Sequence, residues 1–290
     1  MLDSKVRKVP TLRARWLGQE LRDLREQKGL TLRQVAGYLK RNFSALSRFE
    51  NAEWPIPRQD VQLLLDLYGV AEKRERARLT RLSEEVWRKD DWISEYNDAL
   101  YDPSFSEVPW LEQRAKRIAS FDGMYLLGLL QTRGYATAMI GAMESAATQD
   151  QIARWVELRL RRQRVLEGQR PTRISAIVPE SVLRTPVGGA EVMSGQLNHL
   201  CRLTRKRHIE VRVLPAGTGA HAGMDGPFLL FEMDDPFPEV AYVENLGGRA
   251  FLTAPKTKPF VDAYDRLRAA ALDPDESTKL IMSIAEELDD

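Results

Sequence analysis

The chain has 290 residues, of which 43% are hydrophobic and 29% charged, a composition that fits a globular protein of about two domains and excludes a disordered or fibrous one. No apolar run approaches the roughly 18 residues of a membrane-spanning helix, and the basic N-terminus lacks the apolar stretch of a signal peptide. The single cysteine, Cys201, excludes an internal disulfide. We therefore expect a cytoplasmic protein. The net charge of +1 conceals an asymmetry, since residues 1–89 carry 20 Lys and Arg against 12 Asp and Glu, and this basic front indicates a polyanionic partner.

The basic front predicts five short helices. Leucines recur at helical spacing from Leu17, and Gly29 follows as a C-terminal stop. Thr31 with Gln34 forms a capping box that begins a second helix, and Asn42 is a strong N-cap for a third. The predicted helices span about residues 12–28, 32–39, 43–50, 58–68 and 72–88.

The second and third helices are spaced as a helix-turn-helix. Two crossing helices would bury Val35 and Leu39 of the second helix against Leu46 and Phe49 of the third. The small Ala36 permits a close crossing. In such a unit the second helix enters the DNA major groove, and short polar side chains let its backbone approach the bases. The alternative is a helical bundle that only packs or binds protein.

Residues 17–70 resemble the helix-turn-helix of the Cro/lambda-repressor-like (xenobiotic-response-element) family, above all in the stretches LTLRQVAGYL and SALSRFENAEWPIP. The resemblance implies base contacts from the first, second and sixth residues of the third helix, Phe43, Ser44 and Arg48. Backbone amides at the helix starts would hold phosphates, with Arg13 as a further phosphate contact. The residues expected at the DNA are Arg33, Lys40, Arg41, Asn42, Phe43, Ser44, Ser47, Arg48 and Asn51.

Two residues depart from this family's pattern. Lys40 stands where the turn usually carries glycine, and Ala52 stands where a glycine usually follows the third helix. We expect both residues to be held at positive φ, which is uncommon for residues other than glycine and carries modest strain.

The composition changes after the helix-turn-helix. From Trp87 to Trp110 the chain is aromatic and acidic and is interrupted by Pro103 and Pro109, so we interpret it as a connector. The predicted organisation is a helix-turn-helix DNA-binding domain at residues 1–85, a connector at 86–109 and an α/β sensor or partner-binding domain at 110–290.

Helical and strand patterns alternate in the rest of the chain, which predicts an α/β layered domain. The arginines from Arg154 to Arg164 are expected on a solvated outer face, with a second nucleic-acid surface as the alternative. The fold class is therefore multidomain, an all-α helix-turn-helix domain followed by an α/β domain. Helices are expected at residues 110–121, from Thr132 to 143, and at 148–166, 190–206, 258–272 and 275–287, and strands at 173–180, 209–215, 226–233 and 240–245.

No catalytic constellation accompanies this domain. The three histidines lack metal-ligand spacing, Cys201 has no paired cysteine, and no nucleophile elbow or GxxxxGK[ST] motif is present, so we expect no enzyme activity, no metal and no cofactor. The glycine-rich loop at residues 215–228, PAGTGAHAGMDGPF, either approaches a ligand closely or serves as a flexible connector. The residues of this second predicted site, for a ligand or a partner, are His221, Asp225, Gly226 and Phe228.

Several stretches in the same order resemble the C-terminal domain of WhiJ-like actinobacterial regulators, which join it to this kind of helix-turn-helix. They are LLGLLQTRGYA, RLRRQRVL, ESVLRTPVGG, VRVLPAGTGAHAGMDGPFLLFE, VAYVEN and LRAAALDPDES, and together the two resemblances cover about residues 12–285. Leu127 stands where that family usually has proline. The resemblance implies a cytoplasmic transcriptional regulator, sometimes antitoxin-like, that is often encoded beside a small partner protein.

Three functions are compatible with these patterns. The leading one is a sequence-specific DNA-binding transcriptional regulator whose C-terminal domain senses a ligand or binds a small protein partner. It would bind a two-fold symmetric operator in double-stranded DNA as a homodimer, and no membrane. The alternative is an antitoxin-like neutraliser of a small partner protein with autoregulatory DNA binding. The third is an enzyme with an appended DNA-binding module, which a turnover-competent site near His221 and Asp225 would support.

Overall fold

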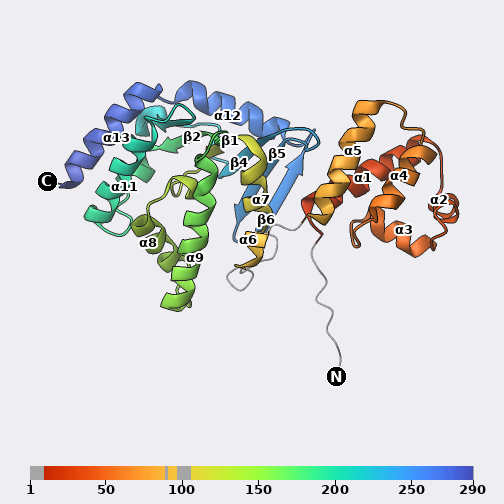
Figure 1. Cartoon of the computed structure of the whole chain (residues 1–290). Coiled ribbons are helices and arrows are strands. Elements are labelled where there is room, and N and C mark those ends of the chain that lie inside the picture. Colours follow the sequence, from red (N-terminus) through yellow and green to blue (C-terminus); the bar gives the residue numbers. More distant parts are fainter. Residues whose placement is uncertain (1–9, 89–90, 97–105, 290) are drawn as a thin grey trace. The chain divides into compact units, whose positions relative to one another are not determined.

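The computed structural model describes residues 10–88, 91–96 and 106–289, and contacts divide the chain into two compact units. Of the described residues, the first unit holds 10–88, 91–94, 106–107 and Asp235–Phe237, and the second holds 95–96, Val108–Asp234 and 238–289. Helices build the first unit, whereas the second combines helices with a sheet (Figure 1). The predicted fold class, an all-α domain followed by an α/β domain, is confirmed.

The five helices predicted in the first unit are all present. Each contributes a leucine or valine to one core: Leu17, Val35, Leu46, Leu64 and Leu79 are at most 1% exposed. Burying one such side chain contributes about 1.5–3 kcal/mol, and this shared core stabilises helices that are too short to be stable alone. The helices are α1 (Leu12–Gln27), α2 (Leu32–Tyr38), α3 (Phe43–Glu50), α4 (Arg58–Leu67) and α5 (Lys73–Trp87), and the short α6 (Asp91–Ser94) follows them.

The two non-glycine turn residues lie at positive φ, as predicted. The φ angle is 52° at Lys40 and 57° at Ala52. Lys40 reverses the chain between α2 and α3, and the N–H of Arg41 donates to the carbonyl oxygen of Ala36 at 2.9 Å to close the turn. A non-glycine residue in this conformation costs roughly 1–2 kcal/mol, so the helix packing on either side must hold these turns in place.

Helices α1 and α3 approach each other closely at Gly18. A Cβ atom on Gly18 would lie 2.5 Å from the carbonyl oxygen of Glu50 and 3.0 Å from that of Phe49. Both neighbours are backbone atoms, which cannot rotate away as a side chain could. The crossing therefore requires glycine, and it fixes the C-terminal end of α3 against α1.

The second unit is built on a six-stranded mixed sheet with the order β3-β2-β1-β4-β5-β6. The strands β1, β2 and β3 are parallel, whereas β4 pairs antiparallel with β1, and β5 and β6 continue antiparallel beyond it. The strands are β1 (Ala115–Phe121), β2 (Arg173–Pro179), β3 (Ile209–Leu214), β4 (Phe228–Met233), β5 (Val240–Asn245) and β6 (Gly248–Thr253).

Helices pack on this sheet and on one another. Helix α12 contacts β1, β3 and β4, and its Tyr264 and Leu267 share a core with Phe121 and Leu230. Helix α13 packs on α11 and on the edge strand β3, and α8 packs on α9. In the described part of the chain no helix is long and apolar enough to cross a membrane. The helices are α7 (Glu107–Arg114), α8 (Arg133–Met143), α9 (Gln149–Arg162), α10 (Glu180–Arg184), α11 (Ala190–Leu203), α12 (Lys258–Ala270) and α13 (Pro274–Asp289).

Two helices expected in this unit are wrong in part, and one strand was not predicted. The helix predicted at residues 110–121 ends at Arg114, and the rest of that segment is β1, the strand between β2 and β4. The last four residues of β1 are all buried, and a strand covered on both faces lacks the alternation that would reveal it. The strand β6 is missed because its side chains are only half-buried at the sheet edge. The helix predicted at 148–166 ends at Arg162, and a 3-10 turn over Gln163–Leu166 follows it.

The arginines of α9 do not all lie on a solvated face. Arg162 is buried, and its Nε and Nη2 atoms donate to the two carboxylate oxygens of Glu112 at 2.9 and 2.7 Å. Arg159 is half-buried, whereas Arg154 and Arg164 are exposed. The prediction of a solvated arginine face is therefore wrong for Arg159 and Arg162.

The close crossing at Gly18 can be tested by substitution. Gly18→Ala should lower the free energy of unfolding of the first unit by about 1–3 kcal/mol, because the added methyl group meets backbone atoms of α3. Gly37→Ala in α2 is the matched control: nothing lies within 4 Å of its Cβ position, so the helix propensity of alanine should stabilise the unit by up to about 1 kcal/mol. Hydrogen exchange of the α1–α5 amides in the full chain measures both. Effects of the same sign would contradict the close crossing.

Candidate nucleic-acid interface

Side-chain caps fix where α2 and α3 begin. The Oγ1 atom of Thr31 accepts a hydrogen bond from the N–H of Gln34 at 3.3 Å, and Oε1 of Gln34 accepts one from the N–H of Thr31 at 2.8 Å, which completes the predicted capping box. The Oδ1 atom of Asn42 accepts from the N–H of Ala45 at 2.7 Å. A cap of this kind stabilises a helix by about 1 kcal/mol, so the start of α3 at Phe43 is well defined.

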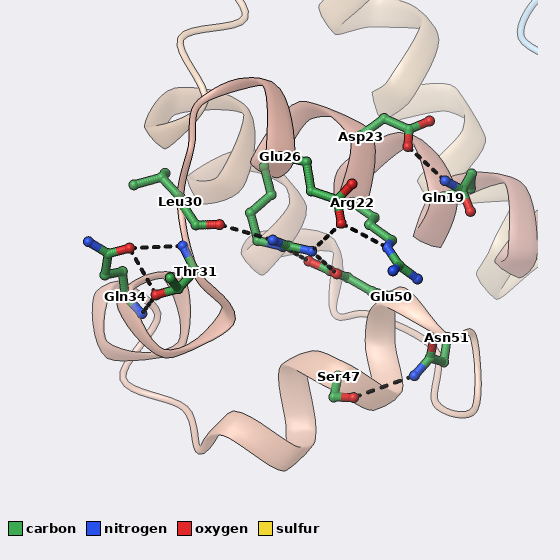
Figure 2. Close-up of polar contacts among 11 residues, drawn as sticks. Gln19, Arg22, Asp23, Glu26, Leu30, Thr31, Gln34, Ser47, Glu50 and Asn51 are labelled. Carbon is green, nitrogen blue, oxygen red and sulfur yellow. Dashed lines mark hydrogen bonds and ion pairs between the residues drawn. The ribbon is translucent and has the colours of Figure 1, made fainter.

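A buried ion pair joins α1 to the end of α3. The Nε and Nη2 atoms of Arg25 donate to the two carboxylate oxygens of Glu50 at 2.7 and 3.0 Å, and Nη1 donates to the carbonyl oxygen of Leu30 at 2.9 Å. Figure 2 labels Leu30 and Glu50, which supply the acceptors of these hydrogen bonds. The hydrogen bond to Glu50 raises the pKa of Arg25 above its usual value, although burial opposes the shift. One side chain thus connects α1, the segment before α2 and the last residue of α3.

The outer side of α3 carries two rows of side chains at four-residue spacing. Ser44 and Arg48 form one row, and Phe43 and Ser47 form the next, opposite the buried side that faces the core. Phe43 is 48% exposed, so its ring is available to an apolar group of a partner. The amide of Asn51 donates to Oγ of Ser47 at 3.4 Å (Figure 2). The structure exposes all of the residues expected at DNA except the half-buried Ser47: Arg33, Lys40, Arg41, Asn42, Phe43, Ser44, Arg48 and Asn51.

Trp54, which the sequence patterns do not single out, holds the side chain of Arg48. The guanidinium carbon of Arg48 lies 4.3 Å from the centroid of the Trp54 ring. The backbone N–H of Trp54 donates to the carbonyl oxygen of Arg48 at 3.3 Å. The centroid of the indole ring lies 6.5 Å from the centroid of the Phe49 ring. A cation–π contact at an exposed site contributes about 0.5–1 kcal/mol and restricts the rotamers of the arginine. The spacing of residues along the sequence does not predict a contact between a tryptophan in a loop and an arginine in a helix. The contact between Trp54 and Arg48 is therefore known only from the structure.

The carboxylates near α3 are mostly neutralised within the unit. Glu50 is paired with Arg25, and the buried Asp60 is paired with Arg41 at 2.9 Å. The Arg41 guanidinium is therefore engaged, and a phosphate would have to compete with Asp60 for it. Of the five cations between Leu30 and Arg58, Arg33, Lys40, Arg48 and Arg58 are exposed and form no ion pair with a described residue. The surface around α3 is consequently positive, as a polyanion requires.

Two cations differ from the sequence-based expectation. Arg13 is only 9% exposed, so the predicted phosphate contact from this side chain is wrong. Arg58, which the patterns did not mark, is exposed at the first position of α4, beside a hollow of about 640 Å³. Helix α4 has no side-chain N-cap, and uncapped N–H groups beside an arginine suit a phosphate group. The hollow is lined by Pro57, Arg58, Gln59 and Trp87.

The second predicted site, at the loop of residues 215–228, is only partly assembled. The rings of His221 and Phe228 both contact Phe121, at centroid distances of 5.7 and 6.2 Å. Nδ1 of His221 accepts a hydrogen bond from the N–H of Gly223 at 3.1 Å, and Phe228 is buried in the core beneath α12. Asp225 is exposed and Gly226 is half-buried at a φ of 121°. These contacts give His221 and Phe228 a packing role, and ligand binding by the four residues stays a prediction.

Comparisons with known proteins agree with the two-unit architecture. A family model described as a helix-turn-helix domain matches residues 16–79, which contain α2, α3 and the turn between them. A second model, described as a domain of unknown function (DUF5753), matches residues 105–283. No curated protein and no solved structure matches the chain. The helix-turn-helix domain supports a DNA-binding regulator. Because the second match spans more than half of the sequence, the chain belongs to the family of the domain of unknown function DUF5753, here preceded by a helix-turn-helix domain.

Proposed function

We propose that the chain is a sequence-specific transcriptional regulator that places α3 in the major groove of DNA. The outer side of α3 carries this proposal. Small hydroxyls at Ser44 and Ser47 let the helix backbone approach the base edges, and Arg48 extends beside them, held on Trp54. An arginine at this position suits the O6 and N7 atoms of guanine, and the exposed Phe43 suits a thymine methyl group.

The contacts to the DNA backbone come from the cations around α3. Arg33 and Lys40 precede the helix, and Arg58 begins α4 with uncapped N–H groups. Such contacts fix the register of a protein on the duplex but do not read its sequence. One helix-turn-helix reads about one half-site, so we propose that two copies of the chain bind a two-fold symmetric operator.

For the second unit we propose a binding role, as a ligand sensor or as the docking site of a small protein partner, and no enzymatic one. Its resemblance to the C-terminal domain of WhiJ-like regulators supports this role. The alternative is an antitoxin-like neutraliser of a small protein encoded nearby, whose DNA binding regulates its own synthesis. Co-purification of a small protein with the chain would favour this alternative over a ligand sensor.

Binding to DNA from the chain's own upstream region tests the proposed function. The full chain should bind this DNA more tightly than scrambled DNA of equal length, and both affinities should fall as salt rises, because bound cations release condensed counterions. Fluorescence anisotropy across a salt series measures both quantities. His221→Ala is the control in the second unit and should leave the DNA affinity unchanged. Equal and weak binding to the two DNAs would contradict a sequence-specific regulator.

Base reading by Arg48 predicts a selective loss. Arg48→Ala should weaken binding to the specific DNA by about 1–3 kcal/mol and change the affinity for scrambled DNA far less. Arg81→Ala is the charge-matched control, because it removes an exposed arginine from α5. It should alter neither affinity. The same anisotropy titration provides the comparison, and equal losses on both DNAs would assign Arg48 to a phosphate contact instead.

A further inference from the structure

The starts of the parallel strands β2 and β3 carry a cluster of cations in an acidic part of the chain. The residues from 90 onward hold 23 Lys and Arg against 30 Asp and Glu, yet residues 170–173 and 202–208 hold six cations and no carboxylate. All six side chains are exposed, and none forms an ion pair with a residue that the structure describes. We call this cluster the basic edge, and its members are Arg170, Arg173, Arg202, Arg205, Lys206 and Arg207.

Strand pairing brings the two segments of the basic edge together. Ile174 of β2 pairs in parallel with Ile209 of β3, and the N–H of Ile174 donates to the carbonyl oxygen of His208 at 2.8 Å. Arg173 is the first residue of β2, and Arg207 immediately precedes His208. The two arginines therefore lie at the starts of neighbouring strands, whose backbones are about 4.8 Å apart.

Two further contacts hold the loop before β2 beside the turn before β3. The Nε2 atom of His208 lies 3.1 Å from the carbonyl oxygen of Leu166. The N–H of Thr172 donates to the carbonyl oxygen of Val165 at 2.9 Å. The loop between these contacts carries Arg170, so this side chain is held beside the basic turn that leads into β3.

The end of α11 supplies the rest of the basic edge. Arg202 lies in the last turn of the helix, and in the turn that follows the N–H of Lys206 donates to the carbonyl oxygen of Leu203 at 2.9 Å. Burial lowers the pKa of His199, and the nearby charges of Arg202 and Lys206 lower it further. The negative end of the helix dipole favours cations at this turn, but it does not account for Arg173 on β2.

Cations on the neighbouring strands are paired with carboxylates, whereas the basic edge is not. Lys116 is paired with Asp234 at 2.6 Å, and Arg212 of β3 with Glu210 at 2.9 Å. Glu167, in the loop before β2, is exposed and forms no ion pair with a described residue, so the edge keeps an excess of about five positive charges. These like charges repel one another. A duplex, which carries one negative charge per about 1.7 Å of its length, removes this repulsion when it binds.

We propose that the basic edge binds phosphates of the DNA that α3 reads, so that the second unit adds sequence-independent contacts to the complex. This inference rests on the proposed DNA-binding function, because a duplex held by α3 is present at a high effective concentration at the second unit of the same chain. Contacts from arginine and lysine to phosphates strengthen binding without reading the bases.

The salt dependence of DNA binding tests the basic edge. Each phosphate contact that is lost should reduce the slope of log affinity against log salt by about 0.9. Lys206→Gln/Arg207→Gln in the full chain should therefore reduce the slope by about 1–2 and weaken binding about 5–50-fold near 0.1 M salt. The factor should be the same for the upstream DNA and for scrambled DNA, which fluorescence anisotropy measures.

Two further double variants separate a local contact from a change in net charge. Lys256→Gln/Lys279→Gln removes two exposed lysines outside the basic edge and should leave the slope unchanged. Arg170→Gln/Arg173→Gln removes the cations of the other segment and should reproduce the loss, and it decides the matter if the first variant does not fold. Equal unfolding temperatures establish that the variants are folded. A slope that falls equally in the lysine control, or in neither variant of the basic edge, overturns the proposal.

Selectivity and slope separate the two proposals. Preference of the unsubstituted chain for its upstream DNA, with an unchanged slope in the basic-edge variants, would refute the basic edge alone. Equal binding of the unsubstituted chain to both DNAs, with a slope that falls in these variants, would refute the sequence-specific regulator and leave the phosphate contacts standing.

Discussion

The ion pair between Arg25 and Glu50 is the constraint on which the proposed DNA-binding surface depends, because Glu50 is the last residue of α3. A buried pair of this kind adds little net stability, yet losing one partner leaves an uncompensated buried charge at a cost of about 3–5 kcal/mol. Gly18 brings α1 against the last carbonyl groups of the same helix, and Asn42 caps its first turn. A helix of eight residues is thereby held at both ends, and its outer side chains are free to serve a function.

Several unfavourable features lie at the surfaces to which we assign binding. Lys40 and Ala52 are held at positive φ on either side of α3, and Phe43 presents an aromatic ring to water. Such features persist where the surrounding structure enforces them, and they concentrate at functional sites. In the first unit the side chain of Arg48 is positioned in advance by Trp54.

The sequence predicts best what is determined locally. The helices of the first unit were predicted nearly completely from the caps Thr31 and Asn42 and from the 3.6-residue spacing of apolar side chains. The exposed side of α3 was predicted as well. Prediction fails where distant segments decide the outcome. The local pattern of residues 115–121 predicts a helix, but pairing with β2 and β4 makes this segment the strand β1. The local pattern likewise predicts an exposed Arg162, but its ion pair with Glu112, fifty residues earlier in the chain, lies in the interior. The contact of Trp54 with Arg48 likewise exists only in the folded chain.

Photo-crosslinking of the full chain to iodouracil-substituted DNA from its own upstream region maps the DNA-binding surface most directly. If α3 enters the major groove, the crosslinked peptides should come from residues 31–54, with the exposed Phe43 and Trp54 as aromatic acceptors. Crosslinks concentrated on α9 and the turn after it, around the exposed Arg154 and Arg164, would contradict this account and move DNA binding to the second unit.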